Sequence, residues 1–122
     1  MTQHEKELIA VICTAIQSKR LIRFWYENAS GRRLKEWRTV EPYIIGAYAQ
    51  SRIQLSAWLL PAPEQLMTGQ QEAWRSYTLR NISEVQLLET TFQPRSDYDP
   101  QGSGMKTLLC TLQKEPRNLR IV

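Results

Sequence analysis

Hydrophobic positions near the N-terminus repeat with the period of a helix. Leu8, Ile12 and Ile16 recur every four residues, and Ile9, Val11 and Ala15 widen the same stripe. Thr2 and Glu5 have the spacing of a capping box, in which each side chain bonds the other residue's backbone N–H. The pattern predicts one amphipathic helix over residues 3–18, whose apolar face must pack on a larger body.

After Lys19 the hydrophobic period changes to two, which is typical of half-buried strands. In the clearest case, Ile53, Leu55, Ala57 and Leu59 share one face. A turn at 28–31 predicts that the first two strands form a hairpin, and Pro42, which has no N–H, is expected to end the second. The segment 61–73 is expected to be a loop. Strands are predicted over 21–26, 32–40, 43–48, 53–60, 74–79 and 82–88.

One leading helix and five or six short strands predict a mainly β (α+β) fold. We expect an N-terminal helix (1–18) packed on a small Sm/SH3-like five-stranded antiparallel β-barrel (19–92). Residues 93–122 are expected to form a linker and a short C-terminal element. Gln93–Gly104 is rich in Pro and Gly, and the periodicity of Met105–Leu112 fits either a strand or a short helix.

The 122 residues suffice for one ordinary domain, with 42% hydrophobic and 23% charged residues. The longest uncharged apolar run, Leu8–Ile16, is far shorter than a membrane span, and Thr2–Glu7 does not resemble a signal peptide. Cys13 and Cys110 have no framework spacing, so we interpret them as small core residues of a protein in the reducing cytoplasm.

Charge is unevenly distributed along the chain. The net charge is +4, and 11 of the 16 basic residues are Arg, whose planar fork suits phosphates and aromatic faces. Residues 19–38 hold seven basic and two acidic residues, a local charge of +5, which leaves −1 for the remainder. The sequence therefore indicates a basic block around the first hairpin.

Catalytic chemistry finds little support in the sequence. His4 is the only histidine and lies in the first helical turn, where a solvated surface position is the simplest interpretation. Neither cysteine has a second histidine to activate it, and the acidic pair Asp97 and Asp99 falls in the Pro-rich segment. No zinc spacing, Walker loop or dinucleotide-binding glycine pattern occurs. We therefore expect a non-enzymatic protein without catalytic residues, metal ligands or cofactors.

Four segments in order resemble the WYL domain family. Arg20–Gly31 resembles its opening hairpin, and Arg38–Tyr43 its R-x-V-x-P-Y segment. Arg75–Ile82 resembles the later R-x-F-x-L-D-R-I segment, and Phe92 the closing phenylalanine. At the eponymous Trp-Tyr-Leu strand this chain has Ile53-Gln54-Leu55, so only the leucine remains. Asp-Arg of the family is replaced by Arg80-Asn81, which moves the basic group by one residue and toward the other face of a strand.

The resemblance implies an Sm- or SH3-like barrel that senses ligands in bacterial and phage-defence-linked regulators. Some members bind single-stranded nucleic acid or nucleotide-like ligands through a basic groove. The 18 residues before the barrel hold one helix, so we expect a stand-alone domain without a helix-turn-helix.

Six residues are candidates for ligand binding. Phosphate contacts are expected from the arginines; for Arg38 the alternative is an ion pair with Glu36 or Glu41, and for Arg52 a position that merely flanks a turn. Tyr43 is expected either to stack a base or to pack beside Pro42, and Arg23 to lie with Trp25 on the non-core face, where both can stack a base. The candidates are Arg23, Arg38, Tyr43, Arg52, Arg75 and Arg80.

Two functional hypotheses remain open. In the first, a regulatory module binds single-stranded DNA or RNA, or a nucleotide-like phosphate ligand, through an Arg-rich barrel face. In the second, a strand edge or the helix stripe supports self-association or docking to a regulatory protein partner without ligand binding. Neither hypothesis involves a membrane.

Overall fold

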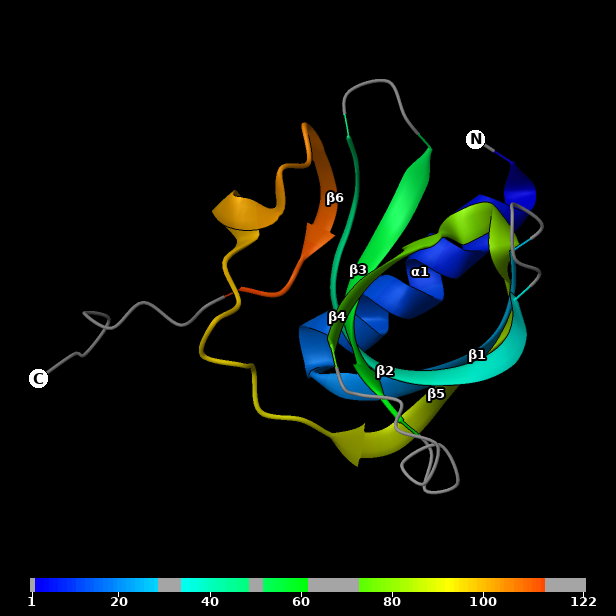
Figure 1. Cartoon of the computed structure of the whole chain (residues 1–122), viewed down its shortest axis with the longest axis horizontal. Helices are drawn as coiled ribbons and strands as arrows, with labels where there is room; N and C mark the ends of the chain where they lie inside the picture. The colour runs from blue at the N-terminus through cyan, green and yellow to red at the C-terminus, as the bar shows by residue number, and fades with distance from the viewer. Residues whose placement is uncertain (1, 29–33, 49–51, 62–72, 114–122) are drawn as a thin grey trace, which may run out of the picture.

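The computed structural model describes residues 2–28, 34–48, 52–61 and 73–113. A single helix packs against an antiparallel sheet that curves around it (Figure 1). The elements in this part of the chain are α1 (Gln3–Ser18), β1 (Arg20–Asn28), β2 (Leu34–Ala47), β3 (Ile53–Leu60), β4 (Ala73–Thr78), the 3₁₀ turn η1 (Leu79–Asn81), β5 (Ile82–Thr91), the 3₁₀ turn η2 (Pro100–Ser103) and β6 (Thr107–Thr111).

The predicted helix and its capping box are confirmed. The Thr2 hydroxyl accepts the Glu5 N–H at 3.0 Å, and the Glu5 carboxylate accepts the Thr2 N–H at 3.0 Å. Lys19 ends α1 in the left-handed region, at φ 56°. The predicted stripe is narrower than expected because Val11 is exposed. His4 is exposed as predicted, yet its Nε2 lies 2.8 Å from the carbonyl oxygen of Ile82 and so ties α1 to β5.

Five strands follow the order β4-β3-β2-β1-β5, and β6 pairs with the C-terminal part of β2. All the pairs are antiparallel. The three-residue turn η1 connects β4 to β5, which are the two ends of this order. Beside it, the Thr78 N–H donates to the Tyr26 hydroxyl of β1 at 3.2 Å. The fold is therefore mainly β, with one N-terminal helix and an antiparallel sheet of five or six strands.

The prediction that Pro42 ends a strand is wrong. β2 continues from Leu34 to Ala47, and its register against β3 shifts between Pro42 and Ile44. A bulge is one of the places where a sheet tolerates a residue without an N–H. The apolar run at 43–48 therefore belongs largely to β2. The bulge also turns Ile44 to the same side of the sheet as Glu41, opposite Ser56 of β3.

Two apolar layers lie on opposite sides of the sheet. The concave layer includes the buried residues Ile22, Phe24 and Leu55, and α1 packs on it through β1, β2, β5 and β6. The outer layer is a cluster of aromatic rings from β2, β3, β4 and the segment after β5. Its rings are Tyr43, Trp58, Trp74, Phe92 and Tyr98.

Residues expected to be a linker form the outer cover of the sheet. Tyr98 is buried, and its hydroxyl donates to the Leu112 carbonyl at 2.8 Å. The Arg95 N–H donates to the Tyr43 hydroxyl at 3.0 Å. The following β6 resolves the ambiguous segment 105–112 as a strand. β6 lies so close to β2 that a Cβ on Gly46 would stand 2.4 Å from the Thr107 carbonyl oxygen, and only glycine fits there.

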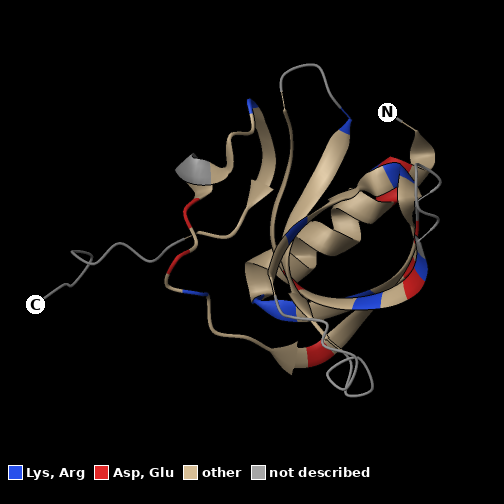
Figure 2. Ribbon diagram, viewed as in Figure 1, with Lys and Arg blue, Asp and Glu red and all other residues tan. Residues whose placement is uncertain are grey.

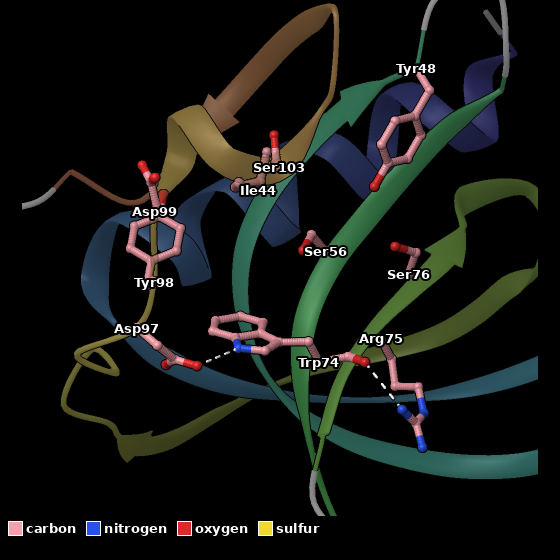
Figure 3. Close-up of a pocket in the computed structure, with 10 residues that line it drawn as sticks. All are labelled: Ile44, Tyr48, Ser56, Trp74, Arg75, Ser76, Asp97, Tyr98, Asp99 and Ser103. Atoms are coloured by element: carbon pink, nitrogen blue, oxygen red, sulfur yellow. Dashed lines mark hydrogen bonds between the residues drawn. The ribbon is translucent and has the colours of Figure 1, made fainter.

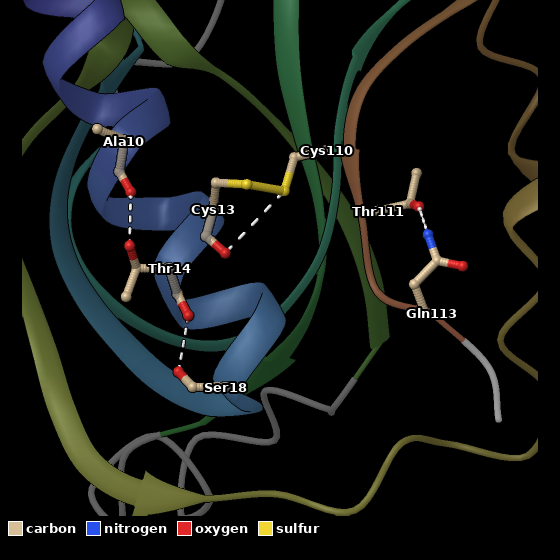
Figure 4. The surroundings of a disulfide bond; sticks show 7 residues. All are labelled: Ala10, Cys13, Thr14, Ser18, Cys110, Thr111 and Gln113. Atoms are coloured by element: carbon tan, nitrogen blue, oxygen red, sulfur yellow. Dashed lines mark hydrogen bonds between the residues drawn. A yellow bond between two sulfur atoms is a disulfide. The ribbon is translucent and has the colours of Figure 1, made fainter.

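Cys13 and Cys110 form a disulfide, which corrects their interpretation as small core residues. Their Cα atoms lie 5.9 Å apart although 97 positions separate them in the sequence, and the bond joins α1 to β6 (Figure 4). The cysteine usage therefore no longer favours a reducing compartment, and a cytoplasmic location stays a prediction. None of the described helices is both long and apolar enough to span a membrane.

Reduction of this disulfide is expected to lower the free energy of unfolding by about 2–4 kcal/mol, because it releases a long closed loop in the unfolded chain. Urea unfolding with and without dithiothreitol measures the change. The double variant Cys13→Ser/Cys110→Ser is the control, and dithiothreitol should not change its unfolding midpoint. Equal unfolding midpoints for the oxidised and reduced wild type would contradict the expectation.

Candidate anion-binding cluster

Arg38 is a buried cation on the concave face of the sheet. It lies opposite Phe24 of β1, so strand alternation directs its side chain toward the core, and only 8% of the residue is exposed. Its Nη2 forms an ion pair with Glu36, two positions earlier on the same face. Its Nε and Nη1 are buried and have no hydrogen-bond partner among the described residues.

Tyr77 places a second buried polar group on this face. Tyr77 is on β4 and pairs with Leu55 of β3. Its ring makes edge-to-face contacts with Phe24 at 5.2 Å and with Tyr26 at 5.0 Å. Within the described chain its hydroxyl also has no hydrogen-bond partner. Burial raises the pKa of Tyr77 to about 12, against the opposing charges of Arg38 and Arg75. The hydroxyl therefore stays a neutral donor at physiological pH.

Arg75 brings a third donor to the edge of this group. Arg75 is on β4 and pairs with Ala57 of β3. It is exposed, and its Nη1 donates to the Trp74 carbonyl at 3.2 Å. Because the charges of both Arg38 and Arg75 act on the Tyr77 hydroxyl, the three side chains share one electrostatic environment. We call Glu36, Arg38, Arg75 and Tyr77 the Arg38 cluster.

The Arg38 cluster is suited to hold an anion. A buried donor without an acceptor costs free energy, and a buried guanidinium costs more than a neutral group. Glu36 serves one nitrogen of Arg38 and leaves two others and a phenol without acceptors among the described residues. A ligand with several oxygens, such as a phosphate, satisfies such a set better than one carboxylate can. The Glu36 carboxylate is partly exposed, with 28% of its side chain accessible, whereas the Arg38 side chain is 9% accessible.

Arg23 lies on the opposite face of the sheet from Arg38. It pairs with Thr39 of β2, and its guanidinium lies 4.0 Å from the centroid of the Trp37 ring. Trp25 meets Trp37 edge to face at 5.5 Å. These three residues form a half-buried aromatic and cationic surface, which we call the Trp37 surface. Sequence analysis missed Trp37, although alternation from Arg38 placed it on this face.

Tyr43 lies inside the outer aromatic layer. It is completely buried, its hydroxyl donates to the Glu41 carboxylate at 2.9 Å, and burial raises its pKa above the usual value. Its burial favours packing, the alternative that the sequence left open, and a ligand contact from Tyr43 stays a prediction. The ion pair that the sequence offered as the alternative for Arg38 forms with Glu36, because Glu41 lies on the outer face of the sheet.

Arg52 and Arg80 are not brought to the Arg38 cluster by any described contact. Arg52 is exposed just before β3. Arg80 is exposed in the 3₁₀ turn η1 and not in a strand, so the sequence argument that it turns to the other face of a strand does not apply to it. The backbone hydrogen bond from Thr2 is the main cause that lowers the pKa of Glu5, and the charge of Arg80 adds a smaller effect in the same direction. Arg80 therefore lies toward the start of α1. Figure 2 shows the described basic residues distributed over several elements.

Arg95 is a polar residue that sequence analysis missed. Its Nε and Nη2 bond the two oxygens of the buried Glu41 at 3.0 and 3.1 Å. The same guanidinium lies 4.1 Å from the centroid of the Trp58 ring. Arg95 thus fastens the outer cover to β2 and β3. No local signal marks this role in a segment of Pro, Gly and polar residues.

A sheet curved around one helix, with a buried cation on its concave face, defines a small, mainly β domain. The chain belongs to the WYL domain family, because the family's model matches residues 7–87, more than half of the chain. The resemblance found in the sequence is thereby confirmed, and family membership indicates a regulatory module. No metal-holding group of three or more His, Cys, Asp or Glu residues occurs within the described ranges.

The fold is also found in a solved structure. The chain is similar to proteasome accessory factor B/C (PafBC) of Arthrobacter aurescens, with a TM-score of 0.58 and 22% sequence identity. The similarity covers 81% of this chain and 14% of the PafBC chain, so this chain corresponds to a small part of that protein. A comparison with curated proteins found no match.

Replacement of Arg38 by Met is expected to leave the free energy of unfolding unchanged or to raise it by up to about 1 kcal/mol. It removes a buried charge of which two nitrogens lack acceptors among the described residues, and the Glu36 carboxylate that remains is partly exposed to water. Chemical denaturation measures the change. Phe24→Ala, a neighbouring core variant, should lose about 3–5 kcal/mol. A loss above about 2 kcal/mol for Arg38→Met would show instead that Arg38 is a structural ion-pair residue.

Proposed function

We propose that this chain is a non-enzymatic regulatory module that binds a phosphate-bearing ligand at the Arg38 cluster. The observation that carries the proposal is the set of buried donors, two nitrogens of Arg38 and the Tyr77 hydroxyl, without acceptors among the described residues. Membership of the WYL domain family supports a regulatory role. In this proposal the phosphate replaces the carboxylate of Glu36 and bonds Arg38, Tyr77 and Arg75.

We propose further that the curved sheet is an Sm/SH3-like barrel. The strand order β4-β3-β2-β1-β5 and the short η1 connection between the terminal strands support this assignment. In such a barrel, the concave residues surround a small interior that is filled by side chains. The Arg38 cluster then lies on the interior wall rather than on a flat outer surface.

Single-stranded nucleic acid is the ligand source that the structure favours. The Trp37 surface offers rings and a guanidinium on which bases can stack. It lies on the other face of the same two strands that carry Arg38 and Phe24. A strand that wraps around the hairpin would reach both places, whereas a mononucleotide would use the Arg38 cluster alone.

Glu36 acts as an internal competitor in this proposal. Its carboxylate already neutralises Arg38 at Nη2, so an incoming phosphate must displace it. The competition weakens binding but keeps the buried guanidinium paired when no ligand is bound. Removal of the negative charge should therefore strengthen binding.

Fluorescence polarisation with labelled single-stranded dT10 and rU10 tests the proposal. Arg38→Met should weaken binding by about tenfold or more, the scale of a lost charge-assisted bond. Glu36→Gln should strengthen it several-fold, and wild-type affinity should fall steeply with salt because phosphate contacts release counterions. Lys6→Met removes the same charge from the exposed face of α1 and is the matched control.

The outcomes separate the ligand sources. Competition by AMP as effective as by unlabelled dT10 would point to a nucleotide ligand and against a role for the Trp37 surface. The same affinity for Arg38→Met and Lys6→Met, or no binding at low salt, would overturn the proposal.

The alternative of a protein–protein or oligomerisation module stays a prediction. One observation favours it: Leu108 and Leu109 of β6 are 43% and 44% exposed. Among the described strands, β6 pairs only with β2, and a partner strand could pair with its other edge.

A further inference from the structure

A pocket of about 330 Å³ lies on the outer face of the sheet, away from the concave face that carries Arg38. Its floor is the row Ile44, Ser56 and Ser76, which are neighbours across β2, β3 and β4 (Figure 3). This volume is at the lower end of the range of small-molecule sites.

The pocket exists because small side chains occupy the middle of a large-residue surface. Ser56 and Ser76 face each other in the ladder, between the pair Trp58 and Trp74 on one side and the pair Gln54 and Thr78 on the other. Two hydroxymethyl groups leave a hollow where larger side chains would fill the surface. The register shift at Pro42 directs Ile44 into the same row.

Aromatic rings form two sides of this hollow, and Trp74 is fixed in place. Its Nε1–H donates to the Asp97 carboxylate at 3.0 Å, and its ring meets Tyr43 at 4.8 Å and Trp58 at 5.3 Å. Figure 3 shows Trp74 at one side of the pocket and Tyr48 at the other. The Trp74 ring is thus held before any ligand arrives, so a bound ligand does not have to order it.

The charges that line this pocket favour a cation. Asp97 and Asp99 line it together with one cation, Arg75, which gives a formal charge of −1. The Arg75 guanidinium bonds the Trp74 carbonyl and points away from the pocket (Figure 3). Carboxylates beside aromatic faces attract organic cations, because ring faces and carboxylates both present negative potential. A phosphate would meet the opposite sign.

We propose that this outer-face pocket binds a small organic cation of the alkylammonium class. The ammonium would lie over the Trp74 ring near Asp97 and Asp99, and the serine hydroxyls of the floor would bond polar groups of the ligand. The pocket lies on the other face of the sheet from Arg38 and Tyr77, so Arg75 is the one residue that the two proposed sites share. It also depends on residues 97–99, outside the segment 7–87 that matches the family.

Isothermal titration of the full chain with choline and with 3,3-dimethyl-1-butanol, its neutral isostere, tests the charge preference. Choline should bind in a saturable manner, and the neutral alcohol about tenfold more weakly or not at all, the scale of a desolvated cation–π contact. This comparison uses the wild-type protein and does not depend on how any variant folds. No saturable choline binding would overturn the proposal, and equal binding of both probes would assign the pocket to neutral hydroxylated ligands.

Variants locate the site. Asp97→Asn/Asp99→Asn should weaken choline binding about tenfold. Glu84→Gln/Glu89→Gln, at exposed positions on β5, removes the same charge and is the matched control. Ser56→Leu should abolish binding because it fills the floor, and Thr90→Leu, an exposed position on β5, should not. Choline binding that survives Ser56→Leu in a folded chain would overturn the assignment. Arg38→Met should leave choline binding unchanged, so the two proposals can fail separately.

Discussion

The register shift of β2 at Pro42 decides which side chains face the helix and which face the outer cover. Before the shift, Arg38 and Val40 face the concave side with Phe24 and Ile22 as their neighbours. After it, Ile44 lies outward opposite Ser56, and Ile45 returns to the core opposite Leu55. One strand thereby supplies both a buried cation to the inner layer and the floor of a pocket to the outer layer.

The two faces that result carry opposite chemistry. The concave face holds a guanidinium that the Glu36 carboxylate bonds at one nitrogen, and the other two buried nitrogens have no acceptor among the described residues. On the outer face the Arg95 guanidinium bonds both oxygens of Glu41, so this charge pair is satisfied, and Asp97 and Asp99 make the nearby pocket negative. The sheet lies between Arg38 and the pocket, so the two faces present these charges in different directions.

Local signals predicted the parts of the fold that depend on neighbours in sequence. The capping box at Thr2 predicted α1, and alternation predicted the face of β3 that is buried. Arg38 and Arg75 were found as candidates because they lie in segments that resemble the family. The disulfide, the Arg95 to Glu41 ion pair and the burial of Tyr98 depend on partners that are remote in sequence. The prediction of a strand end at Pro42 was wrong because proline occurs both at strand ends and at bulges.

The most direct test of the account is the side-chain Nε–H resonance of Arg38, observed by NMR during titration with dT10. The signal is assigned by its absence from the Arg38→Met spectrum. Because Nε has no acceptor among the described residues, a bound phosphate should shift its proton downfield and slow its exchange with water. An Arg38 resonance that stays unchanged while dT10 binds would contradict the assignment of the concave face as the phosphate site.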